Sequence, residues 1–341
     1  MSTPRRLGVL VPCRNEAPVI ERKLRDLARQ GWPASTRRHV VLVVDDHSED
    51  GTAVRAEGLR HELDQAGLDL RVESSEARPG KNGALEHGLA RLADEVDLVV
   101  LTDADVLLGE GALERLAAAF DRHARLGMAT GEQVFVDQLD ELGRARPRAA
   151  IWDRGTAWVR RLESSLGRLF SVHGQLLAWR AELGLRPRRG VAADDVDLML
   201  QVRGSAWPEV RLVRGARFFE QKVQAEEGDA QALRRARAWF QVFEGLPRPA
   251  GFGGLASLQW VAYRHLPAHM TWIVCELLGL LVALAFLAWG PAAALVTLLA
   301  LVALSLSPLG AEVRRTLAVA RQARRLERDG AMEEAWETRR A

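Results

Sequence analysis

The pattern of hydrophobic and polar positions is clearest in the first 125 residues, where apolar runs alternate with amphipathic stretches. The expected strands are Leu7–Pro12, Val40–Val44, Leu70–Val72 and Val96–Leu101. The expected helices are a segment after an Asn15 N-cap with Val19, Ile20, Leu24 and Leu27 on one face, then Gly51–Ala66, Asn82–Leu92 and Glu110–Phe120. Continuous apolar strands separated by helices predict an α/β fold with a mostly parallel sheet and helices on both faces.

The middle of the chain has a mixed pattern. A strand is expected over Met128–Val136, and helices over Ile151–Leu169, Asp194–Arg203 and Asp229–Glu244. We expect Trp152 and Trp158 to pack in the core, with stacking on sugar rings as the alternative. Residues 1–246 are expected to form one domain, followed by a linker over 247–267 that begins with a Pro/Gly-rich stretch.

Composition changes near the C-terminus. Met270–Trp289 holds one charged residue, Glu276, and Pro291–Gly310 holds none. Each stretch is long enough to cross an apolar layer of about 30 Å as a helix, and Gly290-Pro291 is a turn signal. We expect a transmembrane helical hairpin over 268–310; a buried soluble hairpin and a re-entrant pair are the alternatives.

Basic residues flank the hairpin and are missing from its turn. Arg264 and His265 precede it, and Arg314, Arg315 and Arg321 lie in the basic tail, 311–341. The positive-inside rule therefore places both ends in the cytoplasm, as in a multi-pass protein of the cytoplasmic membrane. Residues before Leu7 have no signal-peptide pattern, so the N-terminal domain is expected on the same side.

Charge and cysteine content narrow the function further. The formal net charge is +2, which gives no general attraction to nucleic acid. Cys13 and Cys275 lie far apart, so neither a disulfide nor a zinc site is expected.

Polar residues follow each strong strand. The segments are Pro12-Cys13-Arg14-Asn15-Glu16, Asp45-Asp46-His47-Ser48 and Thr102-Asp103-Ala104-Asp105. Ligands bind parallel sheets at the carboxyl ends of the strands. Two carboxylates one residue apart, Asp103 and Asp105, suit a hard cation such as Mn²⁺ or Mg²⁺ that shares its ligands with phosphates; a solvated turn is the alternative.

A glycine-lysine pair opens the helix before the Asp103 strand. Gly80 and Lys81 there would suit the phosphates of a nucleotide through backbone amides, the helix dipole and the ammonium charge. The segment lacks the spacing of a P-loop, and an ordinary glycine turn is the alternative.

Five motifs in this order resemble the family 2 glycosyltransferases of GT-A fold. They are VPCRNE (11–16), VVDDHSEDGT (43–52), GKNGALEHGL (80–89), TDAD (102–105) and ADDVDL (193–198). The resemblance covers roughly residues 7–245. It implies transfer of a sugar from a nucleotide-diphosphate-sugar, with inversion at the anomeric carbon.

The resemblance also implies roles for individual residues. The nucleoside pocket is matched by Pro12 and Glu16, with Arg14 in the same segment, and the pair that contacts base or ribose by Asp45 and Asp46. The nucleotide-contacting turn is matched by Gly80 and Lys81, and the metal-binding motif by Asp103 and Asp105. The acidic pair whose second member is the base is matched by Asp194 and Asp195. An acceptor hydroxyl needs such a base and a diphosphate leaving group needs its charge neutralised, so the chemistry agrees with these roles. A helix N-terminal acid pair is the alternative for Asp194 and Asp195.

Two features bear on the acceptor. His173, in the segment before the acidic pair, is a candidate for contact with phosphates or acceptor, with a structural histidine as the alternative. The Q-x-x-R-W motif of processive members is replaced by Arg235-Ala236-Arg237-Ala238-Trp239, in which Trp239 is retained. Arg234 or Arg237 is a candidate substitute in binding the diphosphate or the acceptor, and Arg235 and Trp239 are candidate nucleotide-sugar contacts. This departure and the single hairpin favour addition of one sugar to a glycan or lipid-linked acceptor in the membrane.

Two other functions fit the sequence less well. A nucleotidyltransferase would have a glycine-rich loop after the first strand, and Pro12–Glu16 contains no glycine. An inactive membrane scaffold would not need the acids that all three acidic motifs retain, namely DDHSEDGT, TDAD and ADDVDL.

Overall fold

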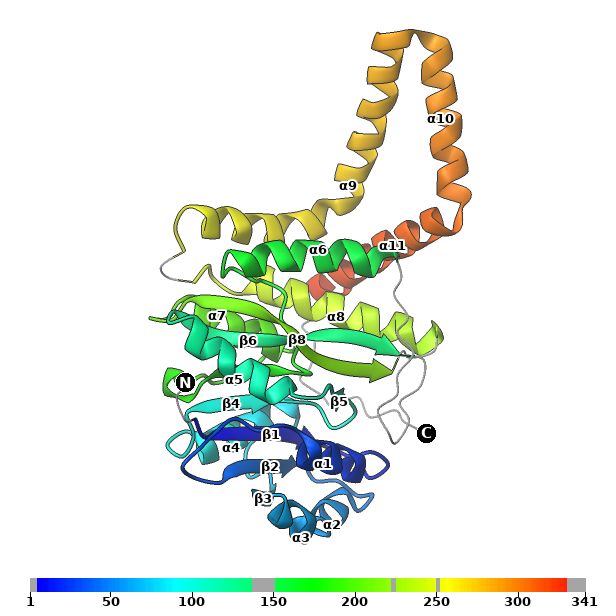
Figure 1. Ribbon diagram of the computed structural model, residues 1–341. Helices are drawn as coiled ribbons and strands as arrows, with labels where there is room; N and C mark the ends of the chain where they lie inside the picture. The colour runs from blue at the N-terminus through cyan, green and yellow to red at the C-terminus, as the bar shows by residue number, and fades with distance from the viewer. Residues whose placement is uncertain (1–4, 137–150, 222–224, 250–251, 330–341) are drawn as a thin grey trace. The chain divides into compact units, whose positions relative to one another are not determined.

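The computed structural model of the protein describes residues 5–136, 151–221, 225–249 and 252–329 (Figure 1). These residues divide into two compact units, each described here by itself. The first holds the described residues up to 221 with Pro249, and the second holds residues 225–248 and 252–329.

The first unit is built on an eight-stranded sheet of order β3-β2-β1-β4-β7-β6-β8-β5. Its strands are β1 (Leu7–Cys13), β2 (His39–Asp45), β3 (Leu68–Ser74), β4 (Leu98–Leu101), β5 (Leu107–Leu108), β6 (Leu126–Val136), β7 (Leu177–Arg180) and β8 (Glu209–Gln221). The pairs β1/β2, β1/β4, β2/β3 and β6/β8 are parallel, while β4/β7, β6/β7 and β5/β8 are antiparallel. The mostly parallel α/β sheet predicted from the sequence is therefore confirmed.

Helices lie between the strands in the order expected for such a sheet. They are α1 (Ile20–Arg29), α2 (Thr52–Glu57), α3 (Arg60–Gln65), α4 (Lys81–Leu92), α5 (Ala112–Arg122), α6 (Ile151–Ser165), the 3₁₀ turn η1 (Ala181–Leu183) and α7 (Asp194–Arg203).

Alternate residues of β1 face helices on opposite sides. Leu7, Val9 and Val11 join one core cluster with apolar residues of α1 and α5. On the other face Leu10 lies against α4, where a Cβ added to Gly88 would be 2.3 Å from Leu10 Cδ1. Because side chains along a strand alternate between faces, a strand covered on both sides must be apolar throughout, as β1 is.

Two local expectations are wrong. Asn15 does not cap α1, which begins at Ile20; Asn15 instead has a left-handed backbone with φ 54°. The helix expected over Gly51–Ala66 is two short helices, α2 and α3. Strands β7 and β8 had no clear sequence signal. Strand β8 alternates buried and half-exposed residues over a long span.

The second unit is helical and consists of α8 (Ala225–Gly245), α9 (Leu255–Trp289), α10 (Pro291–Leu306) and α11 (Pro308–Asp329). Helix α9 includes residues 255–267 of the expected linker and bends along its length (Figure 1). Pro267 lies inside it, and a proline removes one helical hydrogen bond and bends a helix.

Among the described residues, one helix is long and apolar enough to cross a membrane, His269–Trp289. The second apolar helix was expected to continue to Gly310, and this is wrong because α10 ends at Leu306 after 16 residues. Ser307 is extended, with ψ 165°, as the residue before a proline prefers, so Pro308 starts a new helix. Helix α10 packs against α9 and measures about 24 Å, short of a full apolar layer.

Candidate active site

Side chains from the loop after β2 hold the loop after β1. Ser48 Oγ accepts from the Asn15 backbone N–H at 2.8 Å, Thr52 Oγ1 from the Glu16 N–H at 2.8 Å, and Asp50 Oδ2 from the Ala17 N–H at 2.9 Å. The Ser, Asp and Thr of the second motif thus fix the backbone that presents Arg14 and Glu16. The positive φ of Asn15 forms part of this turn.

The neighbours Asp45 and Asp46 have different surroundings. Asp45 accepts hydrogen bonds from the backbone N–H (3.0 Å) and hydroxyl of Ser48, which closes its own loop. Asp46 is 1% exposed; its Oδ2 accepts from the Gly80 N–H at 2.9 Å, and Arg14 lies 3.6 Å from the same oxygen. The other oxygen of Asp46 is buried and has no hydrogen-bond partner within the described structure. An unpaired buried acceptor is costly, which distinguishes Asp46 from Asp45, whose oxygens both accept hydrogen bonds within its own loop.

The turn before α4 is fixed by glycine and asparagine. Gly80 has φ 103°, and a Cβ on Gly83 would lie 1.6 Å from the carbonyl oxygen of Arg78. Asn82 donates to the Val191 carbonyl at 2.6 Å, which ties this turn to the chain just before α7. Gly80 is therefore favoured by its positive φ, and Gly83 is required by close backbone packing at the start of α4.

Lys81 connects two motifs that are far apart in sequence. Its ammonium donates to Asp103 Oδ1 at 2.9 Å and lies 3.7 Å from Asp194 Oδ2. Burial alone would lower the pKa of Lys81, but the charges of Asp103 and Asp194 outweigh it, so the pKa is raised. Lys81 is therefore a fixed cation between the strand-end carboxylates and the acidic pair of α7.

Asp195 lies beside this cation at the start of α7. Its Oδ1 accepts from the Val196 N–H at 2.8 Å and its Oδ2 from the Gly174 N–H at 3.3 Å. Burial and then the charge of Asp194 raise its pKa to about 6. A carboxylate with a pKa near neutrality is a better proton acceptor than an ordinary aspartate, and at pH 7 most of it remains ionised.

The sequence reasoning missed Lys23. This residue of α1 is fully buried and donates to Thr102 Oγ1 at 2.8 Å and to the Val106 carbonyl at 3.0 Å, on either side of Asp103–Asp105. Burial lowers its pKa to about 8, although Asp26, Asp103 and Asp105 act in the opposite direction. A signal was present, because Lys23 lies on the apolar face formed by Ile20, Leu24 and Leu27.

The remaining candidates have different positions. His173 is half-buried, with its ring edge-on to Phe218 at 5.7 Å and its backbone N–H donating to Thr130 at 3.2 Å. Trp158 is 65% exposed, so the expectation that it packs in the core is wrong; the side chain of Trp152 lies outside the described residues. Arg235 and Trp239 belong to the second unit, where Trp239 packs against Phe243 and Tyr263 at ring distances of 4.4 and 5.5 Å.

The site suits a divalent ion only in part. Within the described ranges, no three His, Cys, Asp or Glu side chains gather as a metal site. Asp103 and Asp105 offer two hard oxygen donors on one half-exposed loop. Such a pair fits Mn²⁺ or Mg²⁺ if the substrate phosphates supply the other ligands.

Comparison with known proteins bears on the family and the fold. The model of the glycosyltransferase-like family 2 matches residues 4–240. The β-monoglucosyldiacylglycerol synthase of Synechocystis sp. is 32% identical over 112 residues, which is 33% of this chain and 22% of that relative. The chain therefore matches about a fifth of the length of this relative.

Two solved structures share the fold. The mannosyltransferase PcManGT from Pyrobaculum calidifontis, in complex with GDP-Man and Mn²⁺, has a TM-score of 0.69 at 24% identity and covers 95% of this chain and 87% of its own. TarS residues 1–349 from S. aureus, in complex with UDP-GlcNAc, has a TM-score of 0.50 at 19% identity, covering 78% and 73%. Both are GT-A glycosyltransferases. A family model that covers most of the chain, together with this shared fold, shows that the protein belongs to the glycosyltransferase-like family 2.

Proposed function

We propose that the protein transfers a sugar from a nucleotide-diphosphate-sugar to an acceptor hydroxyl by a single displacement that inverts the anomeric carbon. The observation that supports this most is the position of Lys81 between Asp103 and Asp194. These contacts bring together three motifs, the first and last of which are more than 100 residues apart. They support a cation that lies between the proposed donor side and the proposed acceptor side.

On the donor side, Asp46 receives the base or ribose through its unpaired oxygen, beside Arg14 and Gly80, which contact its carboxylate. Pro12 and Glu16, of the strand β1 and the loop after it, are proposed to line the same pocket. Lys81 is close enough to exchange Asp103 for a phosphate oxygen when the donor binds. Asp103 and Asp105 would hold a divalent ion. When bound, that ion neutralises charge on the leaving diphosphate. The Mn²⁺ present with GDP-Man in PcManGT supports this part of the proposal.

On the acceptor side, Asp195 takes the proton of the attacking hydroxyl. Its two backbone hydrogen bonds fix its orientation, and burial together with the charge of Asp194 raises its pKa to about 6. Asp194 is bound to the charge network through Lys81 and acts as a positioning residue. His173 directly precedes Gly174, whose backbone N–H donates to Asp195. We therefore propose that His173 lines the acceptor cleft.

The acceptor is proposed to be a membrane lipid or a lipid-linked glycan at the cytoplasmic face. The apolar helix His269–Trp289 supports membrane attachment. The name of the Synechocystis relative, a diacylglycerol glycolipid synthase, supports a lipid acceptor. Arg235 remains a candidate for binding the diphosphate or acceptor; the packing of Trp239 against Tyr263 favours a structural role for that residue.

The test is turnover of labelled nucleotide-sugars with Mn²⁺ or Mg²⁺, for the unmodified protein and for Asp105→Ala. We expect metal-dependent turnover in the first and loss of it in the second, with both proteins folded by circular dichroism. Asp105→Ala with a near-normal rate in Mn²⁺ would contradict the metal assignment. A folded chain that turns over no nucleotide-sugar would favour the inactive scaffold.

A further inference from the structure

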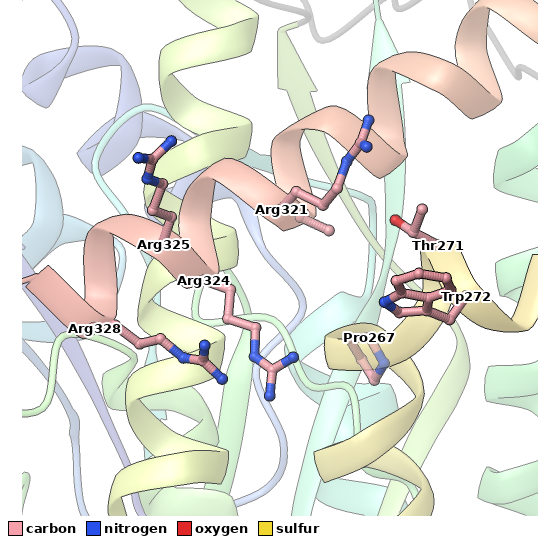
Figure 2. Close-up of a pocket in the computed structure, with 8 residues that line it drawn as sticks. Pro267, Thr271, Trp272, Arg321, Arg324, Arg325 and Arg328 are labelled. Carbon is pink, nitrogen blue, oxygen red and sulfur yellow. The ribbon is translucent and has the colours of Figure 1, made fainter.

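Helix α11 presents four arginines along one side. Arg321, Arg324, Arg325 and Arg328 follow the spacing i, i+3, i+4, i+7, which places them on the same helix face. They line a groove of about 470 Å³, together with Ala320 of α11 and Pro267, Thr271 and Trp272 of α9 (Figure 2). All of these residues belong to the second unit, and α11 packs against α9 there.

The charges of this groove are only partly neutralised. Arg324 donates to Glu244 of α8 at 3.1 Å, and Arg237 of α8 lies 3.7 Å from Glu327 of α11. Arg321, Arg325 and Arg328 are exposed and form no ion pair with any side chain that the structure describes. The groove is therefore positively charged, and its arginines are accessible to an anion.

The groove lies at one end of the candidate membrane span. Thr271 and Trp272 are the third and fourth residues of His269–Trp289, and Trp272 is 71% exposed. Tryptophan at the end of a span is typical of the membrane–water interface, at the level of the lipid head groups. Further along α9, Leu277 and Leu281 are exposed, as expected for side chains that face acyl chains.

We propose that this groove binds the phosphate group of an anionic membrane lipid, with Arg321, Arg325 and Arg328 as its ligands and Trp272 beside the glycerol region. Guanidinium groups bind phosphate through paired, charge-assisted hydrogen bonds, and basic pockets beside membrane helices bind anionic head groups. The proposal rests on the membrane attachment given under the proposed function. It adds a lipid site that requires no sugar transfer.

The experiment is native mass spectrometry of the full chain in neutral detergent, titrated with phosphatidylglycerol or with phosphatidylcholine of the same acyl chains. We expect the unmodified protein to retain phosphatidylglycerol preferentially. The double variant Arg325→Gln/Arg328→Gln should lose roughly thirty-fold in affinity for it. The matched control is Arg314→Gln/Arg315→Gln, which removes the same charge from the same helix outside this groove, and it should change the affinity less than threefold.

Three results would overturn the proposal. The first is an equal loss of affinity in the two double variants, which would mean general charge attraction. The second is no preference for phosphatidylglycerol in the unmodified protein. The third is displacement of the lipid by millimolar inorganic phosphate, which would mean a site for free phosphate. Sugar transfer is measured separately on the same preparations. A protein that binds the lipid and transfers no sugar would contradict the proposed function and support the lipid site.

Discussion

Asp194 and Asp195 are neighbours at the start of α7 with different surroundings. Asp194 is buried and faces the ammonium of Lys81, while Asp195 is half-exposed and held by two backbone N–H groups. We expect Asp195→Asn to lower the transfer rate roughly 10²–10⁴-fold, because an amide cannot accept the proton. Donor affinity should change little, and Asp194→Asn should be less damaging.

The measurement is transfer rate beside the donor dissociation constant for both variants. If Asp195→Asn weakens donor binding in proportion to rate, or if Asp194→Asn is the more damaging change, the two roles must be exchanged.

The pH dependence of transfer gives a second prediction for the same pair. Asp195 must be ionised to act as a base, so kcat/KM should fall as the pH drops through about 6, where its raised pKa lies. Asp194→Asn removes the negative charge that helps to raise this pKa, so the acid limb should move to lower pH. An acid limb that stays in place in Asp194→Asn would exclude this electrostatic coupling.

Lys23 is a buried cation whose hydrogen bonds flank Asp103–Asp105. We expect Lys23→Met to lower turnover roughly 10–100-fold, since Thr102 and Val106 lose the group that positions their loop. The control is Leu24→Met, which changes another buried position of α1 and should leave turnover near normal.

A stability readout separates positioning from misfolding. The pKa of Lys23 is lower in the folded protein than in the unfolded chain. The folded state therefore binds fewer protons than the unfolded chain at pH values between about 8 and the ordinary pKa of lysine. Its contribution to stability therefore becomes more favourable as the pH rises through this range. The Tm of the unmodified protein should therefore rise relative to the Tm of Lys23→Met between pH 8 and pH 10. A large Tm loss that is independent of pH would indicate a general packing defect.

At the scale of elements, the start of α4 shows why a motif needs its glycines. A Cβ at Gly83 would collide with the backbone carbonyl of Arg78, which cannot rotate away as a side chain could. We expect Gly83→Ala to destabilise the protein by about 1–3 kcal/mol and to weaken donor binding, because Gly80 and Lys81 lie in the same turn. Thermal unfolding and donor titration test this.

The matched control is Gly58→Ala at the end of α2. Gly58 has φ −58°, and an added Cβ would have no contact closer than 3.4 Å. The Tm of Gly58→Ala should stay within a few degrees of the Tm of the unmodified protein. Equal effects of the two substitutions would mean that loss of glycine flexibility, and not the clash, explains the result.

At the scale of the whole molecule, α8 belongs with the C-terminal helices. It packs against α11, and its buried Phe243 contacts Trp260 and Tyr263 of α9. We expect a chain that ends at Lys222 to be soluble without detergent, while one that ends at Gly251 aggregates, because it keeps α8 and lacks the helices that cover it. The full chain should require detergent. Equal solubility of the two truncated chains, by sedimentation, would contradict this division.

The sequence by itself determined the order of β1 to β4 and of the helical segments between them, since buried parallel strands must be apolar throughout. It did not predict β5 or the division of residues 51–66 into α2 and α3. It also determined the chemical types at the strand ends, because short motifs such as DDHSEDGT and TDAD act through their own backbone and side chains. The contacts of Ser48, Asp50 and Thr52 with the loop after β1 explain why that motif needs these residues.

Only the tertiary structure decided which of these residues meet. Lys81 contacts Asp103 and Asp194, and Lys23 contacts the loop around Asp103–Asp105. These contacts join segments that are distant in sequence, so no local pattern can predict them. The unpaired oxygen of Asp46 and the different surroundings of Asp194 and Asp195 depend on burial by other elements. The end of α10 at Leu306 has a local cause instead, because the residue before Pro308 prefers an extended backbone; hydrophobicity alone does not reveal it.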